Sequence, residues 1–268
     1  MSNQILNDDL FYEVYESSTL TTNPPIILLH GLLGMGKNLG VISRHLSLTN
    51  KVICIDFPNH GNSYHVNEMN LELLTASVLS LIDHLEIEKI NLFGHSLGGK
   101  VAMLFSLKNP ERVNKLIVAD MAPVSYPTQL SVMFDDLSSL NISSFNTRSE
   151  ISCLLSKYIH DPQVIQLLIQ NIKKINGQFK WRFNLNSIKV GYKDLCRGSS
   201  IPEDGCQFNN PMLLIYGKKS NYWNPMYEEN LRQLFSQAEI YGIEDAGHWL
   251  HMEKPKIFNH YVSSFLEN

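Results

Sequence analysis

Short, unbroken runs of apolar residues alternate along this chain with longer segments in which apolar residues recur every three to four positions. The short runs have the length of buried strands, and the longer segments have the period of helices that pack by one face. Apolar runs without polar alternation are typical of strands covered on both faces, as in a parallel sheet. The runs occupy residues 24–30, 51–57, 89–94, 113–120 and 211–217, with a partly alternating run at 238–243.

Helical segments follow most of these runs, and strands that alternate with helices predict a parallel, doubly wound α/β sheet. One further run, residues 10–17, alternates partially and is expected to form an antiparallel edge strand. The helical segments cover residues 38–46, 70–87, 96–110, 224–237 and 254–267.

The alternation is interrupted once, between Asp120 and Pro211. A structureless loop of that length is improbable in a compact domain, and the helical patterns at 129–140, 148–159 and 162–174 predict a helical insertion. We therefore expect an α/β core from residues 1–120 and 211–268 and a helical cap from residues 121–210. Open α/β sheets bind ligands at the C-terminal edge of their strands, so the cap is expected to cover the site.

Composition and net charge exclude some classes of function. The chain has 268 residues, of which 44% are hydrophobic and 18% charged, and its net charge of −4 provides no basic field for nucleic acid. We see no basic leader before an apolar stretch and no span long enough to cross a bilayer, which favours a cytoplasmic protein. We expect free thiols at all four cysteines, with a Cys196–Cys206 disulfide as the alternative. The cysteines are Cys54, Cys153, Cys196 and Cys206.

A candidate nucleophile lies in the stretch Gly94-His95-Ser96-Leu97-Gly98, which matches the pattern GxSxG. The apolar run before it and the helical segment after it give the strand–turn–helix setting that this pattern needs. In that setting the serine occupies a strained turn that directs its hydroxyl outward, and only small residues fit two positions before and after it. We therefore predict Ser96 as a nucleophile. The alternative is a serine that only caps the helix.

Two backbone N–H groups must hold the negative oxygen of a tetrahedral intermediate. We predict that Leu97, directly after the serine, and Leu32, directly after His30-Gly31, supply them.

The second of these stretches also fits another motif. Gly31, followed after four residues by Gly36-Lys37, matches the phosphate-binding loop GxxxxGK. Position 38 is Asn, however, where that motif needs a Ser or Thr hydroxyl for magnesium. Nucleotide binding would also leave the Ser96 pattern unexplained.

His248 is the candidate general base, because it stands on a predicted loop late in the chain, where this fold class places its histidine. An imidazole pKa of about 6.5 suits a general base near neutrality. One alternative is a structural histidine packed beside Trp249. Another is a metal ligand paired with His251, for which the sequence offers no clear third ligand. We expect no metal and no cofactor.

The acid is less obvious, because the loop after residues 211–217 contains no carboxylate. Asp120 ends the neighbouring apolar run and is expected to face the same edge of the sheet as Ser96, where a carboxylate would orient the imidazole. Glu244 and Asp245 lie on the histidine's own loop, too close along the chain to reach its far nitrogen easily. We favour Asp120 and keep Asp245, and Asp56 or a water-bridged arrangement, as alternatives.

These stretches resemble the α/β-hydrolase superfamily and, more narrowly, its YbfF group of small intracellular serine esterases. The resemblance extends from Pro25 to the C-terminus and implies an α/β-hydrolase fold that hydrolyses carboxylic esters and acyl-coenzyme A thioesters. It implies Ser96, Asp120 and His248 as the triad, with Leu32 and Leu97 as oxyanion donors. The matching stretches read HGLLGMGKNLGVISRHL, DFPNHGNS, GHSLGGKVAM, VADMAPVSY, WRFNLNSI and AGHWLHMEKP.

The expected partner is a small-molecule ester or thioester, bound under the cap. Residues 151–210 hold eight Lys or Arg and four acids. This excess of positive charge either steers an anionic coenzyme A group to the site or belongs to an ordinary solvated surface. A C–C bond hydrolase or lyase with the same triad, or an inactive binding module, are the alternatives, and the oligomeric state stays open. Aromatic and methionine candidates for the acyl pocket are Met133, Phe134, Trp181, Phe183, Tyr222 and Trp223.

Overall fold

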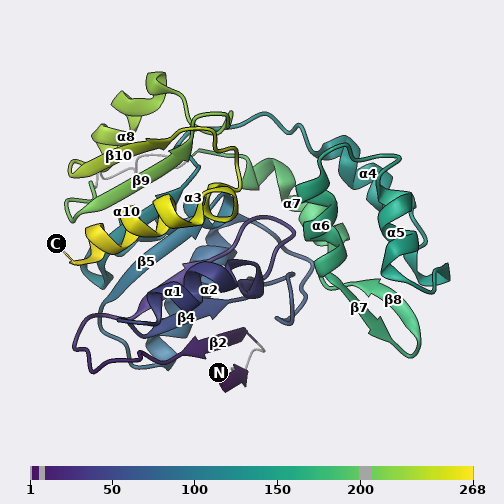
Figure 1. The fold of residues 1–268 in the computed structure, drawn as a ribbon, viewed down its shortest axis with the longest axis horizontal. Helices are drawn as coiled ribbons and strands as arrows, with labels where there is room; N and C mark the ends of the chain where they lie inside the picture. The colour runs from purple at the N-terminus through teal and green to yellow at the C-terminus, as the bar shows by residue number, and fades with distance from the viewer. Residues whose placement is uncertain (1, 6–9, 199–206, 268) are drawn as a thin grey trace.

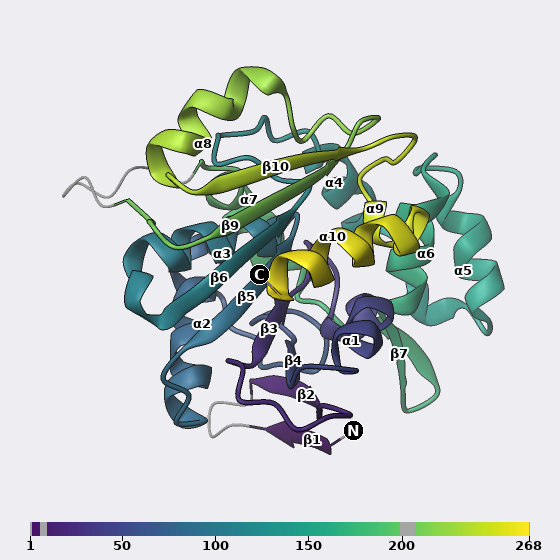
Figure 2. The same cartoon turned by 60° about the vertical axis from the view of Figure 1, so that its left-hand side comes forward.

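An eight-stranded, mostly parallel sheet forms the centre of the structure, a computed structural model that describes residues 2–5, 10–198 and 207–267. The strand order is β1-β2-β4-β3-β5-β6-β9-β10 (Figures 1 and 2). The first two strands run antiparallel to their neighbours, and the other six are parallel. The strands are β1 (Ser2–Ile5), β2 (Phe11–Tyr15), β3 (Ile26–Leu29), β4 (Val52–Ile55), β5 (Ile90–His95), β6 (Val113–Ala119), β9 (Met212–Gly217) and β10 (Ala238–Ile243).

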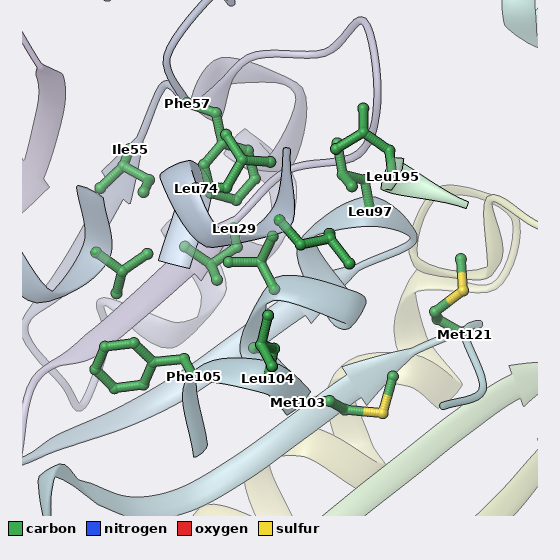
Figure 3. Packing of buried hydrophobic residues seen from close by; sticks show 14 of the residues in the cluster. Leu29, Ile55, Phe57, Leu74, Leu97, Met103, Leu104, Phe105, Met121 and Leu195 are labelled. Carbon is green, nitrogen blue, oxygen red and sulfur yellow. The ribbon is translucent and has the colours of Figure 1, made fainter. Parts of the chain in front are cut away.

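Helices cover both faces of this sheet (Figures 1 and 2). On one face lie α2 (Leu71–His84), α3 (Leu97–Lys108) and α8 (Glu228–Leu234); on the other lie α1 (Gly40–Leu46) and α10 (Pro255–Glu267). Alternate residues of the central strands supply the two cores. In β3, Ile27 and Leu29 pack toward α2 and α3, whereas Ile26 and Leu28 pack toward α1 and α10. Figure 3 shows the first of these cores around α3.

The predicted fold class is confirmed, and so is the antiparallel direction of the strand at residues 10–17. Its predicted edge position is wrong, because β1 pairs with β2 on the outer side, from Ser2 opposite Val14 to Ile5 opposite Phe11. The sequence MSNQIL is short and polar, so it carries no strand pattern of its own.

The insertion after β6 holds helices, as its periodicity predicts, together with a hairpin that the periodicity does not reveal. The hairpin pairs β7 (Ile172–Ile175) with β8 (Gln178–Trp181) through Asn176-Gly177, both at positive φ (49° and 81°). This dipeptide is a strong hairpin signal, and it stands just after the predicted helical pattern at 162–174, whose last residues form β7. The helices are α4 (Ser131–Ser139), α5 (Arg148–Leu155), α6 (Pro162–Gln170) and α7 (Leu185–Leu195).

These four helices and the hairpin gather together, to the right of the sheet in Figure 1. They lie near the C-terminal ends of the parallel strands, and we keep the name cap for residues 121–210. Short single-turn elements complete the described chain: η1 (Gly36–Leu39), η2 (Pro110–Arg112), η3 (Ile142–Ser144), η4 (Pro225–Tyr227) and α9 (Leu250–Glu253).

Cys54, Cys153 and Cys196 are free thiols. The alternative disulfide partner, Cys206, lies outside the described residues. Across the described ranges, every helix is too short or too polar to cross a membrane.

The packing of α10 gives a stability prediction. Phe258 is fully buried and meets the ring of Phe93 edge-on at a centroid distance of 6.1 Å, whereas its neighbour Ile257 is 47% exposed. Phe258→Ala is expected to lower the free energy of unfolding by about 3–5 kcal/mol, because a large cavity would remain. Ile257→Ala should change it by less than about 0.5 kcal/mol. Urea denaturation of both variants measures the difference, and equal losses would contradict this packing.

Candidate active site

Ser96 occupies a sharp turn between β5 and α3. Its φ of 55° and ψ of −118° place a non-glycine residue in a strained conformation. The two glycines of the pattern are required by close backbone contacts. A Cβ at Gly94 would lie 2.1 Å from the carbonyl oxygen of Gly98, and a Cβ at Gly98 would lie 2.2 Å from that of Leu29. The turn therefore forms only with small residues at these two positions, as the sequence indicates.

The imidazole of His248 lies beside this serine, on the loop between β10 and α9. Its Nε2 is 3.0 Å from Ser96 Oγ. The backbone carbonyl of His248 accepts a hydrogen bond of 2.9 Å from Nε2–H of His95, and the ring of Tyr222 stacks on the imidazole at 4.2 Å between centroids. Contacts at the backbone and on the ring face thus fix the orientation of His248.

The carboxylate of Asp120 completes the chain of hydrogen bonds. Asp120 is fully buried at the end of β6, with a φ of 53°, and its Oδ2 lies 2.6 Å from His248 Nδ1. The end of β9 and the loop after it, which has no acid, supply two donors to this carboxylate. The Ser220 hydroxyl donates to Oδ2, and the Gly217 N–H donates to Oδ1 at 3.0 Å.

Strand register explains why residues so distant in sequence meet. His95 pairs with Ala119 across β5 and β6, and Ala119 pairs with Ile215 across β6 and β9. The residues that follow these strands therefore emerge side by side at the same edge of the sheet.

The alternative acids lie elsewhere. Asp245 is exposed and pairs with Lys219 at 2.7 Å, and Glu244 pairs with Lys218. Asp56 is buried, and its two oxygens accept the N–H groups of Gly36 (2.6 Å) and Asn62 (2.8 Å). Burial raises the pKa of Asp56 to about 6. None of these three carboxylates is bonded to His248 within the described structure.

The predicted oxyanion donors are backbone N–H groups of two residues in the same cavity as Ser96. Leu97 is the first residue of α3, so its N–H has no acceptor inside the helix. Leu32 and Leu97 both line the cavity that contains Ser96.

Two buried histidines brace the loop that carries Leu32, and the sequence analysis did not single out their role. Nε2 of His30 accepts the Phe57 N–H at 3.0 Å, and Nε2 of His60 accepts the Leu33 N–H at 3.1 Å. Burial holds the pKa of His30 well below its usual value and lowers that of His60 to about 4, so both rings are neutral acceptors. Their signal in the sequence is a histidine before glycine in each of HGLLG and NHGNS.

A mainly apolar cavity of about 420 Å³ opens over Ser96 and His248, between the core and the cap. Of the six predicted pocket residues, Met133 and Tyr222 line it. Its apolar wall comes largely from cap helices and from the segment before α4. These lining residues are Tyr126, Pro127, Leu130, Met133, Ile159, Val164, Leu167, Tyr192 and Leu195.

The other four predicted pocket residues, Phe134, Trp181, Phe183 and Trp223, do not line this cavity. Phe134 follows Met133 on α4, and neighbouring helical residues point in different directions; its ring packs edge-on against Tyr192 at 4.8 Å. Trp181 and Phe183 stack on each other at 5.1 Å, and Trp223 packs near Tyr216 at 5.8 Å. They are core residues of the cap and of the β9 region.

The metal alternative finds no support in the arrangement of side chains. His251 is buried with its ring 4.6 Å from that of His95. Over residues 2–5, 10–198 and 207–267, His, Cys, Asp and Glu side chains form no group of three with the spacing of metal ligands.

Comparisons with known proteins agree with the geometry. A family model described as alpha/beta hydrolase fold matches residues 24–139. The chain is 32% identical to esterase YbfF of Escherichia coli K12, covering 87% of this chain and 89% of that protein. It is 33% identical to the sn-1-specific diacylglycerol lipase ABHD11 of Danio rerio, covering 97% and 83%. A solved structure of a marine microorganism esterase superposes with a TM-score of 0.89 at 33% identity, covering 96% and 98%.

The acid can be tested by the rate at which a fluorophosphonate probe labels Ser96. Asp120→Asn is expected to slow labelling by about 10³–10⁴-fold, because an amide stabilises neither the required tautomer nor the charged imidazole. Asp245→Asn should change the rate by less than about twofold, since the exposed Asp245 pairs with Lys219 and not with His248. The reverse pattern in the two variants would overturn the choice of Asp120.

Proposed function

Because the chain belongs to the α/β-hydrolase superfamily, within the group of YbfF-like esterases, we propose that it is a serine hydrolase of carboxylic esters. The observation that carries the proposal is the continuous chain of hydrogen bonds from Ser96 through His248 to Asp120. Such a chain is the general means of making a serine hydroxyl nucleophilic.

In the first step, Ser96 Oγ attacks the ester carbonyl carbon while His248 Nε2 takes the hydroxyl proton. Asp120 stabilises the imidazolium that results, and Ser220 and Gly217 hold the carboxylate in place. The N–H groups of Leu32 and Leu97 bind the oxyanion. When the tetrahedral intermediate collapses, the same proton passes from His248 to the departing alcohol, which leaves an acyl-enzyme.

In the second step, a water molecule attacks the acyl-enzyme and gives a proton to His248 Nε2. Collapse of the second intermediate returns that proton to Ser96 and releases the carboxylic acid. The imidazole of His248 therefore becomes positively charged twice in each cycle. The buried Asp120 carboxylate, held in place by its hydrogen bonds, stabilises that charge each time.

The cavity indicates where the acyl group lies. Its wall is mostly apolar and leads directly to Ser96, so burial of hydrocarbon supplies binding energy at about 25 cal/mol per Å². A C–C bond hydrolase or lyase with the same triad would need a particular diketone or enol and would neglect simple aryl esters. An inactive binding module would not react with a fluorophosphonate.

A second candidate substrate class is the acyl-coenzyme A thioester. A further cavity, of about 590 Å³, lies between core and cap and is lined by Lys37, Arg148 and Arg182. Across the described chain, none of these cations belongs to an ion pair. The acids in its wall are Asp56, whose oxygens are occupied by backbone N–H groups, and Glu13.

The adjoining hairpin adds to this positive charge, because Lys173 lies directly opposite Lys180. Like charges opposite each other destabilise a hairpin, and an anionic group nearby would relieve the repulsion. These cations therefore favour a leaving group that carries phosphates.

Graded p-nitrophenyl esters test the main proposal. Parent protein should hydrolyse them, and Ser96→Ala should lose at least about 10³-fold in kcat with a nearly unchanged melting temperature. Ser106→Ala is the matched control, since this buried serine lies on α3 and its hydroxyl donates to the Ala102 carbonyl oxygen of the same helix. Activity of Ser96→Ala within tenfold of the parent would refute the proposal.

Charge removal tests the thioester candidate. Lys37→Gln combined with Arg148→Gln is expected to raise KM for an acyl-coenzyme A by about tenfold and to leave KM for a neutral p-nitrophenyl ester unchanged. Lys193→Gln, an exposed cap lysine outside that cavity, is the control. Equal effects on the two substrates, or no effect on either, would exclude a coenzyme A site in this cavity.

A further inference from the structure

Lys100 is a buried lysine in the wall of the catalytic cavity. It lies on α3 one turn after the nucleophile, where its backbone N–H bonds to the Ser96 carbonyl at 3.2 Å. Only 3% of its surface is exposed. A lysine this deeply buried is rare unless an acid accompanies it, and none of the ion pairs of the described residues includes Lys100.

The ammonium group instead bonds to backbone carbonyls of the cap. Its Nζ donates to the carbonyl oxygen of Cys196 at 2.8 Å and to that of Arg197 at 2.6 Å, and lies 4.8 Å from the centre of the Tyr126 ring. These two carbonyls directly follow Leu195, the last residue of α7. The last carbonyls of a helix have no partner within it, and a positive charge is favourable there.

The charged groups around Lys100 are committed to other partners. Asp194 accepts the Leu71 N–H at 2.9 Å, and Arg197 pairs with Glu72 at 2.6 Å. Burial lowers the pKa of Lys100 to about 8; the neighbouring Cys196 thiol and Asp194 oppose this shift, and Arg197 adds to it. An ammonium group buried without a carboxylate partner carries a desolvation cost, which its two carbonyl bonds and the Tyr126 ring offset.

The ammonium group of Lys100 connects two helices that both border the catalytic cavity. On one side is α3, which begins at Leu97 directly after the nucleophile. On the other side is α7, whose Tyr192 and Leu195, followed by Cys196, form part of the cavity wall. The contacts of Lys100 thus span from the nucleophile helix to the wall that faces the acyl group.

We propose that Lys100 is a positioning residue that holds the end of α7 against the nucleophile helix and thereby sets the length of acyl group that reaches Ser96. The proposal rests on the proposed function, because it assumes an acyl group bound in this cavity and Ser96 as the nucleophile. Lys100 itself takes no part in bond making or breaking.

Alkyl fluorophosphonates of graded chain length provide the test, since they react with an activated serine whatever the natural leaving group. Parent protein should show a clear chain-length optimum in its labelling rate. Lys100→Met, of similar length and without charge, should lower the ratio of the optimal rate to the methyl rate by about tenfold. Lys100→Arg, which keeps the charge and the donors, should restore the parental ratio.

A second measurement does not depend on activity. Between pH 8 and 10.5, unfolded parent protein binds a proton at Lys100 that the folded protein has released. The melting temperature of the parent should therefore rise relative to that of Lys100→Met and of Lys100→Arg across this range. Such a rise would identify Lys100 as the buried charge described above, even if a variant folds poorly.

The outcomes separate the two proposals. No labelling of the parent by any probe would overturn the proposed function and with it this inference. Labelling with an unchanged chain-length profile in Lys100→Met would overturn this inference alone. So would a melting-temperature difference that stays flat from pH 8 to 10.5, or a Lys100→Arg profile that matches Lys100→Met.

Discussion

The fully buried carboxylate of Asp120 is the interaction on which the site depends. It sits at the end of β6 and accepts hydrogen bonds from two other segments of chain: His248 follows β10, and Gly217 and Ser220 lie at the end of β9 and in the loop after it. An isolated buried carboxylate would cost several kcal/mol, so its stability requires all three donors to be in place. The same bonds draw the loops after β9 and β10 toward Ser96, and the site is therefore complete only when the strand order is correct.

Backbone strain is concentrated at this edge of the sheet. Ser96, Asp120 and Leu33 all have φ between 53° and 59°, a region that non-glycine residues rarely adopt and that costs about 1–3 kcal/mol each. The surrounding core holds these residues in place: Leu29 and Val118, on strands beside the site, are fully buried. The strain turns the serine and aspartate side chains out of the plane of the strands and toward His248.

A feature of the fold or the site can be predicted from sequence when a local sequence pattern determines it. The parallel sheet, Ser96 and His248 depend on local patterns: apolar runs, small residues around a turn, and a loop late in the chain. The choice of Asp120 over Asp245 depends on strand order, because the end of β6 lies beside β5, and Asp120 Oδ2 lies 2.6 Å from His248 Nδ1.

Other features depend on side-chain direction, which a sequence pattern does not fix. Met133 and Phe134 are adjacent, yet only the first lines the cavity, because the rotation of α4 is set by its packing against α7. The sequence shows only that the loop containing Ser220 has no acid. The structure shows that the Ser220 hydroxyl donates a hydrogen bond to the Asp120 carboxylate. The Asn176-Gly177 hairpin, in contrast, has a clear signal in its turn residues, although its first strand overlaps the end of the predicted helical pattern at 162–174.

Helix α3, which begins directly after Ser96, links the α/β core to the cap. Eleven of the twelve residues of α3 are buried, because the helix packs on the sheet, on α2 and beneath the cap. A helix buried on all sides tolerates few changes of position, so Ser96 has a fixed place whatever the cap contains. The apolar wall above it, in contrast, comes largely from cap helices that are joined to the core by polar contacts such as those of Lys100. Substitutions in the cap can therefore change the shape of the cavity without disturbing the hydrogen bonds among Ser96, His248 and Asp120.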